Sequence, residues 1–215
     1  RAPGGRATRP TSDRVREAVF DVLEDLVRRA RTAALGEPAA SGPGEPAAAE
    51  PGPVAGPLAG RRVLDLFAGS GALGIEALSR GAAHCTFVER DRPALHALRA
   101  NLAAVGVEVL RRRVEAASPL PPVPTARIAA VDARRALVAD ARGGEMYTLV
   151  LVDPPYARYG ELEGDLARLL APLLAPGALV VLETHCDQAL RLPWRLERVK
   201  RYGDTQVAFM APDEE

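Results

Sequence analysis

Residues 62–74, RVLDLFAGSGALG, decide the fold that we expect of this chain. They begin as the apolar run of a buried strand and continue into a glycine-rich turn, G-x-G-x-x-G, which leads into a helical pattern. A strand, such a turn and a helix in this order form the nucleoside-binding unit of doubly wound α/β proteins. Glu89 ends the next apolar run, where an acidic side chain can bind ribose hydroxyl groups. The pattern predicts a site for a cofactor that contains a nucleoside.

Asp65 lies in the strand just before the turn and indicates which of two kinds of cofactor the turn binds. Its carboxylate would repel a pyrophosphate bound at the amino terminus of the following helix, as a dinucleotide requires. The same carboxylate suits S-adenosylmethionine, whose methionine part carries an ammonium and a sulfonium. A bare turn without a ligand is the weaker alternative, because acidic residues lie on both sides of the turn. We predict that S-adenosylmethionine contacts Asp65, Phe67, Gly69, Ser70, Gly71, Glu89, Arg90, Asp132, Ala133 and Asp153.

The rest of the chain continues as alternating strand and helix patterns, which predict a doubly wound, mostly parallel, Rossmann-like α/β sheet of seven strands. Asp132 follows the third expected strand, where adenine is usually recognised in such folds, but a structural capping role for it is an equally good interpretation. The expected strands are 61–68, 84–89, 127–131, 148–156, 178–183 and a terminal hairpin of 195–203 and 205–211, and the expected helices are 13–32, 71–81, 92–106 and 161–174.

The sequence Asp153-Pro154-Pro155-Tyr156 follows the most apolar of these strands. Two consecutive prolines fix the backbone and remove two N–H donors, so the corner is rigid and its carbonyl groups can accept hydrogen bonds. The Asp153 carboxylate and the Pro154 carbonyl then offer two acceptors to the two N–H groups of a planar amino group. Such a nitrogen is a poor nucleophile, and these acceptors stabilise the positive charge that grows on it. We predict a catalytic role for all four residues, with Tyr156 stacking on the base; a plain strand-ending turn is the alternative.

The amino-terminal region differs from the rest of the chain in composition. We expect a basic arm and an amphipathic helix over 1–32, a flexible Ala/Pro/Gly-rich insertion over 33–57, and a methyltransferase domain over 58–215. A second insertion is expected near 115–125. Arginines beside a helix amino terminus suit phosphate contacts, although a solvated basic tail would have the same composition. The predicted RNA-binding residues are Arg6, Arg9, Arg14 and Arg16.

The overall composition limits the remaining possibilities. Lys+Arg and Asp+Glu both number 28, so no general basic charge marks the chain as a nucleic-acid binder. The two cysteines lack metal-ligand spacing, and no apolar run is long enough for a signal peptide or a membrane span. We therefore expect a cytoplasmic monomer without a metal or a membrane partner. Glu183 ends a central expected strand and either lines the pocket or caps the strand.

Several of these motifs together resemble one family, the bacterial methyltransferases that modify the N2 amino group of one guanine in small-subunit (16S) ribosomal RNA. The resemblance implies the class I methyltransferase fold, S-adenosylmethionine as methyl donor, and small-subunit ribosomal RNA in an assembling 30S particle as the partner. It covers about 1–31 and 58–211, and the insertions are departures from it. The motifs that carry it are RPTSDRVRE (9–17), LDLFAGSGALGIEALSRGA (64–82), FVERD (87–91), LVDPPY (151–156) and YGDT (202–205).

Three other functions share part of this pattern. A DNA adenine-N6 methyltransferase has the same chemical motifs, but it usually needs a target-recognition domain for which this chain has no room. A catalytically silent RNA chaperone would bind the cofactor without product, and the intact Asp153 to Tyr156 motif argues against it. A dinucleotide oxidoreductase would need the glycine turn to hold a pyrophosphate, which Asp65 disfavours.

Overall fold

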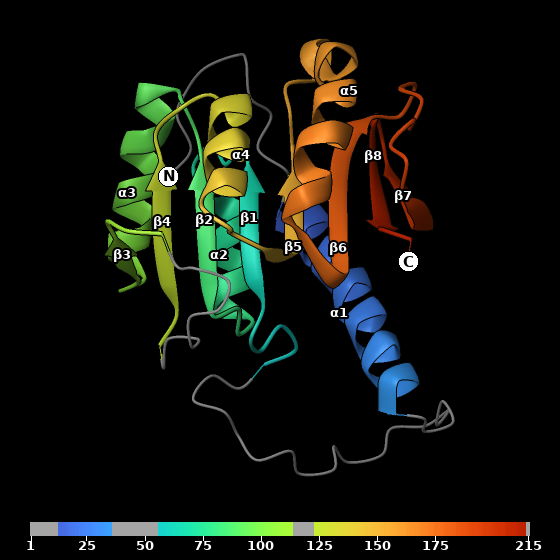
Figure 1. The fold of residues 1–215 in the computed structure, drawn as a ribbon, viewed down its shortest axis with the longest axis horizontal. Coiled ribbons are helices and arrows are strands. Elements are labelled where there is room, and N and C mark those ends of the chain that lie inside the picture. Colours follow the sequence, from blue (N-terminus) through green and yellow to red (C-terminus); the bar gives the residue numbers. More distant parts are fainter. Residues whose placement is uncertain (1–12, 36–55, 114–122, 214–215) are drawn as a thin grey trace.

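The structure is a computed structural model that describes residues 13–35, 56–113 and 123–213. Its strands form one sheet in the order β3-β4-β2-β1-β5-β6-β8-β7 (Figure 1). Strands β1 to β6 run parallel to one another, and β8 is antiparallel to both β6 and β7. The strands are β1 Arg62–Leu66, β2 His84–Val88, β3 Glu108–Leu110, β4 Thr125–Ala129, β5 Tyr147–Val152, β6 Leu174–His185, β7 Arg195–Tyr202 and β8 Thr205–Ala211.

Helices cover both faces of this sheet, because side chains of its central strands are buried on both sides. The apolar side chains of α1, α2 and α3 join one core cluster, and those of α4 and α5 join the cluster on the opposite face, as the two layers of Figure 1 show. The α-helices are α1 Asp13–Leu35, α2 Ala72–Ser79, α3 Arg92–Ala104, α4 Ala133–Arg142 and α5 Tyr159–Leu170, with short 3-10 turns η1 Tyr156–Arg158 and η2 Ala171–Leu173.

The predicted fold class, a doubly wound and mostly parallel sheet, is confirmed, and the expected strand count of seven is wrong by one. The eighth strand is β3, whose three residues are exposed or half-buried at the sheet edge, so it has no apolar run that could reveal it. Helix α4 was also not expected. Its buried face is formed by Ala133, Ala136, Leu137 and Asp140, a stripe with a single large apolar side chain.

Helix α1 is part of the main core. Its side chains Val19, Phe20, Leu23 and Val27 are almost completely buried in the cluster that also holds β1 and β5 side chains. The predicted insertions at 33–57 and 115–125 fall mostly on residues outside the described part of the chain, so the proposed domain division stays a prediction. No described helix is both long and apolar enough to cross a membrane.

The carboxyl ends of the parallel strands all lie on one side of the sheet, at the top in Figure 1. Strand β1 pairs with β2 on one side and with β5 on the other, so the strand order reverses between β1 and β5. In open α/β sheets, ligands bind beside such a reversal, at the carboxyl ends of the strands. Both predicted motifs lie at this point, because the glycine turn follows β1 and the Asp-Pro-Pro-Tyr corner follows β5.

Candidate active site

The glycine turn after β1 has a left-handed backbone that depends on its sequence. Gly69 and Gly71 have φ of 55° and 84°, and Phe67 has φ of 62°, an unusual value for a bulky residue. A Cβ on Gly71 would lie 2.4 Å from Leu98 Cδ1, so both backbone and packing require glycine there. The turn is closed by the Gly71 N–H, which donates to the Ala68 carbonyl at 2.7 Å. The result is a tight loop at the edge of the sheet.

Asp65 is buried beneath this turn. Its carboxylate accepts a 2.9 Å hydrogen bond from the Gly74 N–H, which gives one amide in the first turn of α2 a partner. Burial raises the pKa of Asp65 to about 7; the Gly74 hydrogen bond opposes this rise and the Glu89 charge adds to it. A buried carboxyl whose pKa is raised in this way favours the approach of a cation, because a positive charge stabilises its ionised form.

Glu89 ties the end of β2 to the glycine turn. One carboxylate oxygen accepts the Gly69 N–H at 2.9 Å, and the other accepts the N–H groups of Arg90 and Asp91 at 2.7 and 2.8 Å. A carboxylate has about four acceptor positions, so these bonds leave room for one more donor. The predicted contact with ribose hydroxyl groups stays a prediction, and the observed bonds show that Glu89 also shapes the turn.

Asp132 and Ala133 open helix α4. The Asp132 side chain caps α4 by accepting the Arg134 N–H at 3.0 Å, so the capping interpretation of this residue is confirmed. Its other oxygen lies 3.3 Å from the Arg90 guanidinium. This ion pair joins two of the predicted cofactor residues, which follow the neighbouring strands β4 and β2. The Ala133 side chain is buried in the core, so only its backbone is available to a ligand.

The sequence interpretation missed Asn101 of α3. Its side-chain amide donates to the Ser70 carbonyl at 2.9 Å, and this bond holds the glycine turn against the helix behind it. A lone Asn in an amphipathic helix carries no signal for such a role, since only the folded chain brings it to Ser70.

The Asp153-Pro154-Pro155-Tyr156 corner lies beside the glycine turn. The Asp153 N–H donates to the Leu66 carbonyl at 3.4 Å, and Leu66 is the last residue of β1. Pro154 is buried, Pro155 is exposed, and Asp153 and Tyr156 are partly exposed. The two motifs that the sequence places far apart therefore meet at neighbouring strand ends.

Three carboxyl groups, from three adjacent strand ends, share this region. Burial raises the pKa of Asp153 well above its ordinary value, and the charges of Glu183 and Asp65 raise it further. Glu183 is 8% exposed and directly follows Leu182, which pairs with Val152, the residue before Asp153. Burial and mutual repulsion favour the neutral forms of these carboxyl groups, and a cationic ligand or N–H donors would stabilise their ionised forms.

Tyr156 is fixed by groups from β6 and β8. Its hydroxyl donates to Glu183 Oε1 at 3.2 Å and lies 2.9 Å from Thr205 Oγ1. The His185 ring meets the Tyr156 ring edge to face, with centroids 6.0 Å apart and planes at 68°. The predicted role of Tyr156 as a stacking surface is untested, and its ring orientation is set by these three neighbours.

The predicted RNA-binding arginines are only partly described. Arg6 and Arg9 lie outside the described residues. Arg14 is exposed at the start of α1, whereas Arg16 forms a 3.5 Å ion pair with Glu76 of α2, which competes with a phosphate contact. RNA binding by these residues therefore stays a prediction.

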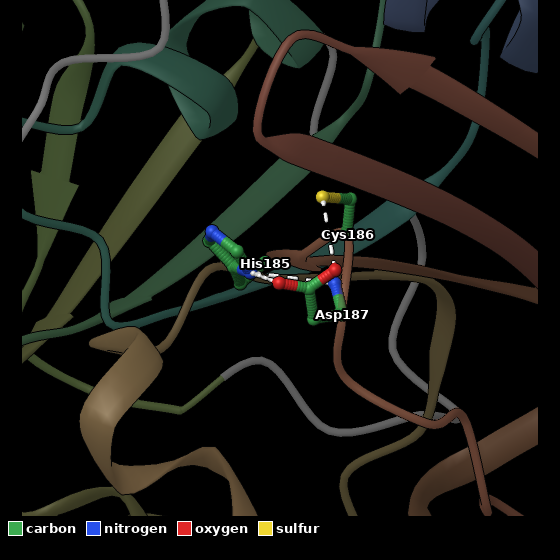
Figure 2. A group of neighbouring side chains, drawn as sticks. All are labelled: His185, Cys186 and Asp187. Atoms are coloured by element: carbon green, nitrogen blue, oxygen red, sulfur yellow. Dashed lines mark hydrogen bonds and ion pairs between the residues drawn. The ribbon is translucent and has the colours of Figure 1, made fainter.

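The last residue of β6 and the two residues after it carry three groups of the kinds that bind metals. His185, Cys186 and Asp187 turn their side chains toward one another (Figure 2), with their ligand atoms within 4.8 Å. In the described part of the chain these atoms already pair among themselves, since Asp187 Oδ2 lies 3.4 Å from His185 Nδ1 and Oδ1 lies 3.7 Å from Cys186 Sγ. The expected absence of a metal remains a prediction that this triplet makes worth testing.

Comparisons with known proteins match the chain to one family and to relatives named as rRNA methyltransferases. Residues 51–211 match the family described as "Conserved hypothetical protein 95". Ribosomal RNA small subunit methyltransferase D of Escherichia coli (strain K12) is 32% identical over 96% of this chain and 80% of its own length. YlbH of Bacillus subtilis (strain 168), which has a provisional name as an rRNA methyltransferase, is 34% identical over 97% and 90%. A solved structure of a hypothetical protein from Thermus thermophilus has a TM-score of 0.64 and 27% identity, over 97% of this chain and 90% of that one.

Proposed function

The chain belongs to the conserved hypothetical protein 95 family, and from this premise we propose that it transfers the methyl group of S-adenosylmethionine to the N2 amino group of a guanine in small-subunit ribosomal RNA. The relatives named as rRNA methyltransferases support the transferase activity and the RNA substrate. The choice of an amino group as acceptor rests on one observation, the position of the Asp153 corner directly beside the glycine turn.

The residues around the turn fit S-adenosylmethionine. Among the described residues, a Cβ added to Gly69 would meet the Phe67 carbonyl oxygen at 4.0 Å and no other atom within that distance, which leaves space for a ligand to approach the backbone. Asp65 lies beneath the same turn, where its carboxylate accepts from the Gly74 N–H, and its raised pKa favours a cationic partner. The residues proposed to hold the cofactor are Asp65, Phe67, Gly69, Ser70, Gly71, Glu89, Arg90, Asp132, Ala133 and Asp153.

The proposed chemistry needs little from the protein beyond alignment and charge stabilisation. When bound, S-adenosylmethionine would supply an activated methyl group and, as the leaving group, would keep the electron pair of the methyl–sulfur bond. Asp153 and the Pro154 carbonyl accept the two N–H bonds of the guanine amino group and orient its lone pair toward the methyl group. As the new N–C bond forms, the nitrogen becomes positive, and one of its protons passes to Asp153. Alignment of this kind can lower a barrier by several kcal/mol.

Tyr156 and the basic start of α1 complete the proposal on the RNA side. The Tyr156 ring, fixed by Glu183 and Thr205, would stack on a guanine turned out of its helix, a contact worth roughly 1–3 kcal/mol per base. Arg14 is exposed and would contact phosphate together with Arg6, Arg9 and Arg16. We propose an assembling 30S particle as the natural substrate.

An Asp153→Ala variant tests the proposal. Binding of S-adenosylhomocysteine is measured by calorimetry, and methyl transfer is measured with labelled donor on immature small subunits and on duplex DNA. Because Asp153 is also among the proposed cofactor contacts, we expect the variant to bind the product cofactor more weakly. At saturating donor we expect it to lose at least about 100-fold in transfer, since paired acceptors for developing charge have effects of this order. Wild-type turnover by the variant would remove the catalytic assignment. Transfer to DNA in place of RNA would favour the adenine-N6 alternative.

A further inference from the structure

Glu183 lies next to Asp153 without having a role in the proposed transfer. The register of β5 and β6 pairs Val152 with Leu182, so Asp153 and Glu183 are the next residues on two neighbouring strands. Val181 belongs to the same core cluster as Leu151, and alternation along a strand turns Glu183 and Asp153 toward that same face. At this spacing the charge of Glu183 raises the pKa of Asp153.

A chain of hydroxyl groups holds Glu183 in one orientation. The Tyr156 hydroxyl donates its single proton to Glu183 Oε1 at 3.2 Å, so in the 2.9 Å contact with Thr205 the Thr205 hydroxyl is the donor. This order requires Glu183 to act as an acceptor toward Tyr156. A carboxylate has two oxygens and about four acceptor positions, so Glu183 can accept from Tyr156 and from other donors at the same time.

Guanine and adenine differ at the ring position beside the amino group. Guanine carries an N1–H next to its N2 amino group, so its Watson–Crick edge shows adjacent donors. Adenine carries an unprotonated N1 next to its N6 amino group, and a carboxylate placed there would face a lone pair. A second hydrogen-bond acceptor beside the acceptor of the amino group therefore selects guanine over adenine. The selection is stronger when this second acceptor is buried, because a buried polar group without a partner cannot bond to water instead.

From this juxtaposition we propose that Glu183 is the specificity-determining residue that accepts the guanine N1–H while Asp153 and the Pro154 carbonyl hold the N2 amino group. The inference rests on the proposed function, because it takes the amino group at Asp153 to be that of a base. Tyr156 then has two tasks, since its ring faces the base and its hydroxyl fixes the residue that reads the base edge.

The test compares two bases that both carry a 2-amino group. Small subunits are assembled from ligated RNA with guanine or 2-aminopurine at the nucleotide that the wild-type protein methylates, which is first located by mass mapping. In 2-aminopurine the N1 position is a lone pair in place of N1–H. We measure kcat/KM on both substrates for the wild-type protein, for Glu183→Gln, and for Glu108→Gln as a matched control at an exposed position of the edge strand β3.

We expect the wild-type protein and the Glu108→Gln control to prefer guanine by roughly 10- to 100-fold, the discrimination of one good base-edge contact. In Glu183→Gln this preference should fall by about tenfold or more, because the new amide can donate to the N1 lone pair. The difference in O6 between the two bases is the same for both proteins and cancels in this comparison. A merely structural Glu183 would slow both substrates equally.

Two results would overturn the inference. One is the same guanine preference in the wild-type protein and in a Glu183→Gln variant that still binds S-adenosylhomocysteine. The other is a wild-type preference close to one, which needs no variant and is informative even if Glu183→Gln does not fold. Failure of the proposed function looks different, because the wild-type protein would then methylate neither base.

Discussion

The Gly69 N–H donates a 2.9 Å hydrogen bond to the Glu89 carboxylate, and this bond joins the turn after β1 to the end of β2. Because Glu89 also accepts two amides of its own segment, it holds the turn in place before any ligand arrives. Replacing Glu89 should therefore affect the site even if the ribose contact proposed for it does not exist.

We expect Glu89→Ala to weaken the binding of S-adenosylhomocysteine by about tenfold or more, since hydrogen bonds to charged groups contribute roughly 1.5–3 kcal/mol each. Calorimetry measures the dissociation constant. The matched control is Glu108→Ala in the exposed edge strand β3, which should bind as the wild-type protein does. Equal affinity in both variants would contradict the role given to Glu89.

Asp65 predicts how stability depends on pH. Its pKa rises from 3.8 to about 7 on folding, so the folded protein keeps a proton that the unfolded chain releases. The unfolded state then binds fewer protons between about pH 4 and pH 7, and the free energy of unfolding falls over that interval and becomes level above it. Asp65→Asn keeps an acceptor for Gly74 and removes the titration, so its urea-unfolding profile should be flatter than that of the wild-type protein.

Binding of the cofactor should lower the raised pKa of Asp65. A cationic cofactor stabilises the ionised carboxyl and lowers its pKa, so binding near pH 6 should release a proton. Titrations of S-adenosylmethionine in buffers of different ionisation enthalpy measure this release, and we expect Asp65→Asn to reduce it. Proton uptake on binding would show that the cofactor's cation does not approach Asp65.

Gly71 combines a left-handed backbone with contact to Leu98. We expect Gly71→Ala to lower the melting temperature and abolish cofactor binding, because its methyl group would collide with Leu98 Cδ1. The double variant Gly71→Ala/Leu98→Ala removes the collision and retains a backbone strain of about 1–2 kcal/mol. Measured against Leu98→Ala alone, the glycine substitution should therefore cost less stability than in the wild-type background.

Asp140 anchors a buried polar group far from the strand ends of the site. Its Oδ2 accepts from the Arg127 guanidinium at 2.7 Å and from the Tyr147 hydroxyl at 2.8 Å, and its side chain is 1% exposed. Asp140→Ala would leave a buried cation unpaired, so we expect a loss of about 3 kcal/mol or more in unfolding free energy. Glu197→Ala, which breaks the surface pair with Arg195, should change stability little.

The expected absence of a metal can be tested directly at His185, Cys186 and Asp187. We expect dialysis against EDTA to leave methyl transfer unchanged, and the activity of Cys186→Ser to match that of the wild-type protein. A loss of transfer that Zn²⁺ restores in the wild-type protein but not in Cys186→Ser would show that the triplet binds a functional metal.

The sequence predicted the sheet and the two motifs because their signals are local. An apolar strand followed by G-x-G-x-x-G or by Asp-Pro-Pro-Tyr can be recognised from neighbouring residues, and the alternation of strands and helices then brings both to one edge. Edge strand β3 and helix α4 were missed because both have few large apolar side chains. Asn101 and Thr205 were missed for another reason: each contacts the site only through residues distant in sequence.

The position of Tyr156, the residue proposed to stack on the base, depends on the register between β8 and β6. Thr205 pairs with His185 in the β6–β8 ladder. Because side chains alternate between the two faces of a sheet, a register shift of one residue would turn Thr205 to the opposite face. The Tyr156 hydroxyl would then lose its contact with Thr205. Mutations in the hairpin of β7 and β8 could therefore change which base is accepted while leaving the affinity for the methyl donor intact. Selection for target choice could act there independently of the chemistry at β1 and β5.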